Sequence, residues 1–218
     1  MKLSCLLEEM EYECVQGTLD REITTLVYDS RKVEKDSAFV CISGAVCDGH
    51  DFAQEVAKKG AAVLFVEKDV EVPEEVTVIR VQNTRLALAQ TSAAYFRHPA
   101  KELITIGITG TKGKTTATYM VRSILEASGF KTGLIGTIET IIGEEKIPSA
   151  NTTPESYVVQ ESFRKMADAG CKCVVMEVSS QGLMLHRVGG FIFDYGIFTN
   201  LEPDHIGPNE HKDLQDYI

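Results

Sequence analysis

The chain has 218 residues, with 22 Lys and Arg against 32 Asp and Glu, so its formal net charge is −10. Apolar residues make up 44% and charged residues 25%, which is typical of a globular protein and excludes a disordered or fibrous one. The acidic balance argues against nucleic acid as the main partner, and no apolar run reaches the roughly 18 residues of a membrane span. The N-terminus turns acidic too early for a secretory signal. We therefore expect a cytoplasmic protein of one large or two small domains, with no nucleic-acid partner and no membrane insertion.

The first hundred residues predict a small α/β domain. In chain order, the predicted elements are a helix over 51–59 that Gly60 ends, strands over 61–66 and 76–81, and a helix opened by residues 83–85 with apolar positions at 86, 89, 93 and 96. Pro99 disfavours helix at the residue before it, so we place the domain boundary there, giving domains 1–99 and 100–218.

The second half alternates strands and helices more clearly. Strands are predicted over 103–108, 132–137, 173–178 and 195–199, and helices over 115–128, with Val121, Ile124 and Leu125 on one face, and from Thr153-Pro154-Glu155 to about 169. Strands separated by helices imply a mostly parallel, doubly wound sheet, whose ligands bind at the carboxyl ends of the strands.

A glycine-rich turn follows the strand over 103–108 and opens the next helix. It reads Thr109-Gly110-Thr111-Lys112-Gly113-Lys114-Thr115-Thr116. In this context the backbone N–H groups can surround phosphate oxygens, Lys114 can reach the β- and γ-phosphates, and Thr115 can place its hydroxyl on Mg²⁺. Ile108 stands where the general phosphate-loop pattern has its first glycine, and the alternative is a plain glycine turn with solvated lysines. We interpret the turn as a nucleoside triphosphate site.

Carboxylates and histidines follow the later strands. Glu177 closes the strand over 173–178, where an acid could hold the metal ion of a phosphate loop, although an isolated glutamate there is more often a cap or surface residue. The tail over 199–211 gathers carboxylates with two histidines, of which His205 is either a ligand or a loop residue. His50 and His186 are interpreted as structural or solvated.

The six cysteines, at positions 5, 14, 41, 47, 171 and 173, contain no C-x-x-C pair. The spacing of Cys171 and Cys173 does not suit a zinc knuckle. We expect all six to be small buried apolar residues in a reducing compartment.

Together these motifs resemble the Mur ligase superfamily, and within it the UDP-N-acetylmuramoyl-tripeptide synthetase (MurE) branch. The turn over 109–116 resembles that family's phosphate loop, which also lacks the first glycine. The other landmarks, in the family's order, are Asp29-Ser30-Arg31, Asp48-Gly49-His50-Asp51-Phe52, Asn151-Thr152-Thr153-Pro154, Met176-Glu177-Val178-Ser179-Ser180, and Thr199-Asn200-Leu201 followed by Asp204-His205. The resemblance covers essentially the whole chain.

The resemblance implies an ATP-dependent amide ligase of peptidoglycan synthesis. ATP would phosphorylate the D-glutamyl carboxylate of UDP-MurNAc-L-Ala-D-Glu, and the amine of a diamino acid would attack the acyl phosphate. The implied nucleotide-binding residues are Gly110, Thr111, Lys112, Gly113, Lys114, Thr115 and Thr116. The implied magnesium residues are Thr115, Glu177 and His205, with Lys114, Glu177 and His205 as the catalytic set. The implied substrate residues are Ser30 at the uridine end and Asn151, Thr152, Thr153, Ser179 and Arg187 around the muramoyl-dipeptide and pyrophosphate.

Three departures from the family pattern bear on these expectations. Leu185 stands where similar enzymes have a substrate-binding glutamine, and Ile206-Gly207 replaces the usual residues after His205, so substrate recognition could differ. The sequence ends at Ile218, before the lysine that these enzymes carbamoylate and before their C-terminal domain. We therefore expect an incomplete ligase that does not turn over alone, with a short nucleotide-binding paralogue as the alternative.

Two other functions stay open. Folylpolyglutamate and cyanophycin synthetases share this type of phosphate loop, but they normally lack the domain that contains Asp29-Ser30-Arg31. A non-catalytic UDP-sugar- or nucleotide-binding module is the second alternative, and the presence of Lys114, Thr115 and Glu177 counts against it. The identity of the added amino acid and the oligomeric state remain open.

Overall fold

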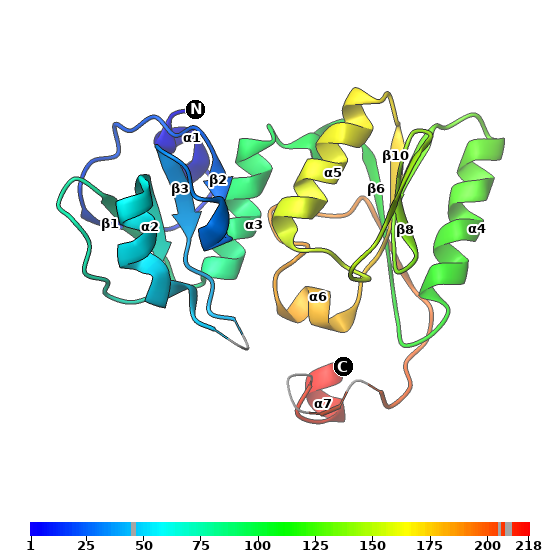
Figure 1. The fold of residues 1–218 in the computed structure, drawn as a ribbon. Helices are drawn as coiled ribbons and strands as arrows, with labels where there is room; N and C mark the ends of the chain where they lie inside the picture. The colour runs from blue at the N-terminus through cyan, green and yellow to red at the C-terminus, as the bar shows by residue number, and fades with distance from the viewer. Residues whose placement is uncertain (45–46, 205, 208–210) are drawn as a thin grey trace. The chain divides into compact units, whose positions relative to one another are not determined.

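The computed structural model describes residues 1–218 except 45–46, 205 and 208–210, and it divides into two compact units, Met1–Tyr95 and Phe96–Ile218 (Figure 1). The division falls four residues before the end of the first predicted domain. Each unit is built around its own sheet.

The first unit has a five-stranded sheet in the order β1-β5-β4-β3-β2, parallel except for β1. Its strands are β1 (Glu13–Gln16), β2 (Leu26–Val27), β3 (Ser37–Val40), β4 (Ala61–Val66) and β5 (Thr77–Arg80). Its helices are α1 (Leu3–Leu7), η1 (Ser30–Lys32), η2 (Gly49–Phe52), α2 (Ala53–Lys59) and α3 (Thr84–Tyr95). Phe39, Leu64 and Val66 pack with Val56 of α2, while α3 packs against β2, β3 and β4. The predicted strands and helices are thus present.

Two details of the first unit refine the sequence prediction. Gly60 ends α2 in the left-handed region, at φ 109°, as expected of a helix stop. The predicted apolar face of α3 is only partly right, because the helix also buries Thr84, Leu88 and Thr91, while Leu86 is only half-buried. The Thr91 hydroxyl donates to the Ala87 carbonyl, so a polar side chain can occupy the buried face.

The second unit has a six-stranded sheet in the order β11-β6-β10-β7-β8-β9. Its strands are β6 (Ile104–Thr109), β7 (Thr132–Ile135), β8 (Glu139–Ile142), β9 (Glu145–Pro148), β10 (Cys173–Glu177) and β11 (Tyr195–Phe198). Its helices are η3 (Pro99–Glu102), α4 (Lys114–Ala127), α5 (Ser156–Asp168), α6 (Ser180–Met184) and α7 (Leu214–Tyr217). The first four strands in the sheet order are parallel, whereas β8 and β9 form an antiparallel hairpin that the sequence analysis missed.

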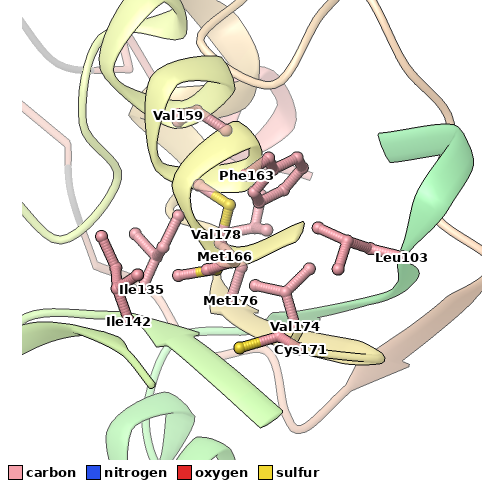
Figure 2. Packing of buried hydrophobic residues seen from close by; sticks show 10 residues of the cluster. All are labelled: Leu103, Ile135, Ile142, Val159, Phe163, Met166, Cys171, Val174, Met176 and Val178. Atoms are coloured by element: carbon pink, nitrogen blue, oxygen red, sulfur yellow. The ribbon is translucent and has the colours of Figure 1, made fainter. Parts of the chain in front are cut away.

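Helices cover both faces of this sheet, as a doubly wound fold requires. On one face Val159, Phe163 and Met166 of α5 pack onto Val174 and Met176 of β10 (Figure 2). On the other face the half-buried Ala117, Val121 and Leu125 of α4 pack onto Ile106, Ile108 and Val175. Figure 1 shows the two helices on opposite sides of the strands. The parallel strands therefore end together, and the loops after β6, β7, β10 and β11 share one edge.

Three sequence predictions, two about burial and one about a helix start, are wrong. Ile124, expected on the buried face of α4, is 64% exposed. Thr153 does not start the next helix, because α5 begins at Ser156 with Glu155 as its N-cap. Cys5, Cys14 and Cys47 are exposed, so only half of the cysteines are buried, although all six are free.

Candidate functional site

The loop between β6 and α4 has the backbone shape of a phosphate site. Gly110 has φ 133° and Gly113 has φ 82°, a region that residues with a Cβ rarely adopt. Gly113 is the N-cap of α4, a helix of 14 residues. The N–H groups of its first turn have no carbonyl partner within the helix, and its dipole favours an anion at this end. The loop can therefore hold phosphate oxygens.

The two lysines of the loop point to different partners. Lys114 Nζ folds back onto the carbonyls of Gly110, at 2.7 Å, and Thr111, at 3.1 Å. Lys112 Nζ instead lies 2.5 Å from Glu202 Oε2, and this hydrogen bond raises the pKa of the Lys112 ammonium. Only Lys114 is thus held over the loop, where it could reach a bound phosphate.

The remaining side chains of the loop differ in their exposure to solvent. Thr111 is buried, and its hydroxyl lies 2.8 Å from the Tyr217 hydroxyl and accepts from the Glu202 N–H at 2.9 Å. Thr116 is exposed at the start of α4. The side chain of Thr111 and its N–H, which donates to the Asn200 carbonyl at 3.0 Å, are therefore both used within the fold.

Glu177 lies at the end of β10 and is only 1% exposed. Its Oε2 accepts from the Thr115 hydroxyl at 2.9 Å and from the Thr137 hydroxyl at 3.1 Å, and its Oε1 accepts from the Thr137 N–H at 2.9 Å. A Cβ at Gly136 would overlap Oε1, so the loop after β7 approaches the carboxylate closely. Among the described residues, no Lys or Arg forms an ion pair with this buried acid.

The oxygen atoms of Thr115 and Glu177 suit a magnesium ion, which prefers oxygen ligands. An acid buried without a positive partner is costly unless a cation binds beside it. No group of three or more His, Cys, Asp or Glu side chains able to hold a metal is found among the described residues, and His205 lies outside them. The donors present therefore fit a hard cation that takes its other ligands from substrate or water.

Thr153 contacts two of the other predicted substrate residues, Ser179 and Arg187. Its hydroxyl donates to the Glu177 carbonyl at 3.1 Å and accepts from the Ser179 N–H at 2.9 Å, and Arg187 Nη1 donates to its carbonyl at 3.0 Å. A Cβ at Gly182 would lie 2.6 Å from Thr153 Cγ2. Thr153 is 1% exposed, and its hydroxyl positions Ser179 while its carbonyl positions Arg187.

The other predicted substrate residues are distributed over both units. Asn151 is exposed, and Oγ1 of the half-buried Thr152 lies 3.0 Å from Thr137 Oγ1. Ser30 belongs to the first unit, where it begins η1 after Asp29. Hydrogen bonds from the side chain and backbone of Arg31 lower the pKa of Asp29 to about 2, so this turn stays charged. The second unit alone thus gathers the predicted phosphate residues and Thr152, Thr153, Ser179 and Arg187.

The remaining predicted positions have simpler surroundings. His50 is buried, with Nδ1 2.6 Å from Asp48 Oδ1, and its Nε2 accepts from the Glu67 N–H at 2.9 Å, so it is structural. His186 has φ 53° in the turn after α6, and Leu185 is the C-cap of that helix. Ile206 is exposed, beside residues outside the described part of the chain.

Sequence reasoning assigned no role to two residues that shape this site. Thr137 joins the Glu177 carboxylate to Thr152, and Asn200 makes both side-chain hydrogen bonds to the backbone of Lys112. Both follow strands at the same sheet edge, which is the signal that could have identified them.

A cavity of about 250 Å³ adjoins the loop and is lined in part by Gly110, Lys114 and Ser180.

Comparison with known proteins identifies the family. The sequence model of the Mur ligase middle domain matches residues 108–218, and that of the Mur ligase family catalytic domain matches residues 22–96. This chain belongs to the Mur ligase family. The match over 108–218 contains the phosphate loop and Glu177, together with Thr153 and its partners Ser179 and Arg187.

Curated Mur ligases give the same result over the full sequence. The UDP-N-acetylmuramoyl-L-alanyl-D-glutamate–2,6-diaminopimelate ligases of Clostridium perfringens and Bacillus velezensis are 48% and 47% identical to this chain. Each alignment covers 100% of the chain and 44% of the relative, so the chain spans less than half the length of these enzymes. A solved structure of an enzyme with the same name shares the fold, with a TM-score of 0.81 at 22% identity over 100% of this chain and 43% of that one.

Proposed function

We propose that this chain contributes the nucleotide site and the acceptor site of an ATP-dependent amide ligase that adds 2,6-diaminopimelate to UDP-MurNAc-L-Ala-D-Glu in peptidoglycan synthesis. The observation that carries the proposal is the Thr115–Glu177 hydrogen bond beside the glycine loop, because it joins a phosphate site to a buried acid. The names of the curated relatives supply the substrates.

The loop residues bind and orient the triphosphate. Backbone N–H groups from Gly113 to Thr116 surround phosphate oxygens at the start of α4, where the helix dipole favours negative charge. Lys114 exchanges its bonds with the Gly110 and Thr111 carbonyls for phosphate oxygens, so its charge approaches the β- and γ-phosphates. Phosphoryl transfer depends mainly on this positioning and charge neutralisation.

Thr115 and Glu177 are the residues that would hold magnesium, together with His205 as the family resemblance implies. When bound, the ion neutralises charge that develops on the transferred phosphoryl group. Thr137 keeps the Glu177 carboxylate in place through two hydrogen bonds, so the acid need not reorganise when the nucleotide arrives.

The reaction itself proceeds in two balanced steps. The γ-carboxylate of the D-glutamyl residue attacks the γ-phosphorus of ATP, which forms an acyl phosphate and releases ADP. The amine of the diamino acid then attacks the acyl carbon, the amide bond forms, and phosphate leaves with the loss of a proton from the amine. Asn151, Thr152, Ser179 and Arg187 hold the muramoyl-dipeptide end, and Ser30 contacts the uridine end.

The compartment that we propose is the cytoplasm. All six cysteines are free, as expected in a reducing environment. In the described residues, no helix is both long and apolar enough to cross a bilayer.

Titration of Mg·ATP into the 218-residue chain tests the nucleotide site. Lys114→Ala is expected to weaken ATP binding roughly tenfold to a hundredfold, because it removes charge-assisted hydrogen bonds to phosphate. Lys112→Ala is the matched control from the same loop, and it should change the affinity less than about threefold because its ammonium is bonded to Glu202. Equal effects of the two substitutions would contradict the assignment of Lys114.

A magnesium titration in the presence of ATP tests Glu177 separately. Glu177→Gln keeps the side-chain shape but removes its charge, so we expect the magnesium dependence of ATP binding to shift to at least tenfold higher concentration. Glu139→Gln, which changes another acid in this unit, is the control and should leave the dependence unchanged. An unaltered magnesium dependence in Glu177→Gln would remove this residue from the metal site.

A further inference from the structure

The segment after β11 lies against the phosphate loop and forms hydrogen bonds with its backbone. Asn200 pairs with the peptide group of Lys112 in both directions, since its Oδ1 accepts from the Lys112 N–H at 2.9 Å and its Nδ2 donates to the Lys112 carbonyl at 3.0 Å. Its own carbonyl accepts from the Thr111 N–H at 3.0 Å. One residue therefore satisfies three backbone groups of the loop.

Thr199 adds to this contact from the neighbouring position. Its hydroxyl donates to the Lys112 carbonyl at 2.8 Å, and its N–H donates to the Thr109 carbonyl at 2.9 Å. A Cβ at Gly110 would overlap the Thr199 hydroxyl and would lie 2.9 Å from the Asn200 carbonyl oxygen. The loop and the segment over 199–200 are thus in direct backbone contact, which only glycine at position 110 permits.

These bonds divide the N–H groups of the loop into two sets. Those of Thr111 and Lys112 point to Asn200, whereas those of the first turn of α4, from Lys114 onward, have no acceptor within the helix. The groups of the second set are therefore the ones left for a phosphate. A loop released at Lys112 could instead turn its peptide groups to water and lose this arrangement.

We propose that Asn200, assisted by Thr199, is a positioning residue that holds the phosphate loop in its nucleotide-receptive shape before ATP binds. The inference rests on the proposed nucleotide site. The residue acts through the loop backbone and contacts no phosphate. Its effect on affinity follows from population, because the apparent dissociation constant equals the intrinsic one divided by the fraction of loops that have the competent shape.

The test measures the dissociation constant of Mg·ATP by calorimetry at a temperature well below the melting temperature of each variant. Asn200→Ala is expected to weaken binding about tenfold, because two hydrogen bonds to the loop are lost. Thr199→Val, which removes one hydroxyl at constant volume, should weaken it about threefold, while Thr199→Ser restores the wild-type affinity. Asn83→Ala is the matched control, because Asn83 caps α3 in the other unit by accepting from the Leu86 N–H.

Amide hydrogen exchange without nucleotide gives a local readout, because the Lys112 amide is compared with the amides of β6 in the same variant. The Lys112 amide should exchange slowly in the wild-type chain and quickly in Asn200→Ala. An ATP affinity of Asn200→Ala within twofold of wild type, or a fast-exchanging Lys112 amide in the wild type, would overturn the positioning role. If Lys114→Ala weakens binding and Asn200→Ala does not, the nucleotide site stands and only this inference fails. A wild-type chain that binds no ATP overturns both.

Discussion

The two glycines of the phosphate loop have different reasons to be glycine. Gly110 combines a φ of 133° with close contact to Thr199 and Asn200, whereas Gly113 has a φ of 82° and open space where a Cβ would lie. Gly110→Ala is expected to lower the free energy of unfolding by about 2–5 kcal/mol, since backbone strain and overlap add. Gly113→Ala should cost about 1–2 kcal/mol from strain alone. Urea unfolding of both variants measures the difference, and equal costs would contradict the packing described around Gly110.

Cysteine reactivity is a second property that single residues decide. Burial, with a smaller contribution from the Asp48 charge, raises the pKa of Cys41 to about 12, so about one thiol in ten thousand is ionised at pH 8. Cys171 and Cys173 are also buried, while Cys5, Cys14 and Cys47 are exposed. We expect a thiol reagent at pH 8 to label the three exposed cysteines quickly and the other three only after unfolding. Peptide mapping after labelling distinguishes them, and rapid labelling of Cys41 in the folded chain would be inconsistent with its burial.

At the residue scale the sequence identified side chains whose role depends on a local pattern. Lys114 and Thr115 follow from the strand, glycine loop and helix, and Glu177 follows from its place at the end of an apolar strand. The contacts of Thr137 with Glu177 and of Asn200 with Lys112 could not be predicted, because the partners lie 40 and 88 residues away along the chain. Thr153 stays a predicted substrate residue, and the structure adds that its hydroxyl bonds to Glu177 and Ser179.

At the scale of elements, the helices on the two faces of the second sheet differ in how much they bury. Phe163 of α5 is fully buried in the cluster of Figure 2 and packs edge-to-face on Phe191, with ring centroids 5.1 Å apart. Phe163→Ala is therefore expected to cost about 3–5 kcal/mol of unfolding free energy.

Ile124→Ala on α4 is the control for this prediction, because Ile124 is exposed. Its cost should stay within about 0.5 kcal/mol. Both values are measured by denaturant unfolding of the full chain. A cost at Ile124 that approaches the cost at Phe163 would mean that α4 buries a face that the structure leaves exposed.

Periodicity predicted the long elements well and the short ones poorly. Strand β4 and most of β10 are continuous apolar runs, so composition alone marks them. The hairpin of β8 and β9 has strands of four residues each, and its signal is confined to Gly143, at φ 60°, in the turn. The predicted start of α5 at Thr153 is wrong. A cap residue followed by proline and an acid predicts a helix start from neighbouring residues alone, whereas the Thr153 hydroxyl bonds to Glu177 and Ser179, which are distant in the sequence.

At the scale of the whole molecule, the two ends of the proposed ligand can be tested separately. Ser30 of the first unit is assigned to the uridine end, and Ser179 and Arg187 of the second unit are assigned to the muramoyl-dipeptide end. Arg187→Ala should therefore reduce the affinity for UDP-MurNAc-L-Ala-D-Glu about tenfold and leave the affinity for UDP unchanged, because one charged side chain is removed from one end of the ligand. Ser30→Ala is the complementary control and should weaken the binding of both ligands. Equal losses for both ligands in Arg187→Ala would contradict this division.

The central claim is that this chain recognises a muramoyl-dipeptide acceptor beside its nucleotide site. Calorimetric titration with UDP-MurNAc-L-Ala-D-Glu, with UDP alone as the reference ligand, tests it most directly. The full ligand is expected to bind at least tenfold more tightly than UDP, since the residues assigned to the dipeptide end add contacts. Equal affinities would show that the chain does not read that end and would contradict the proposed acceptor site.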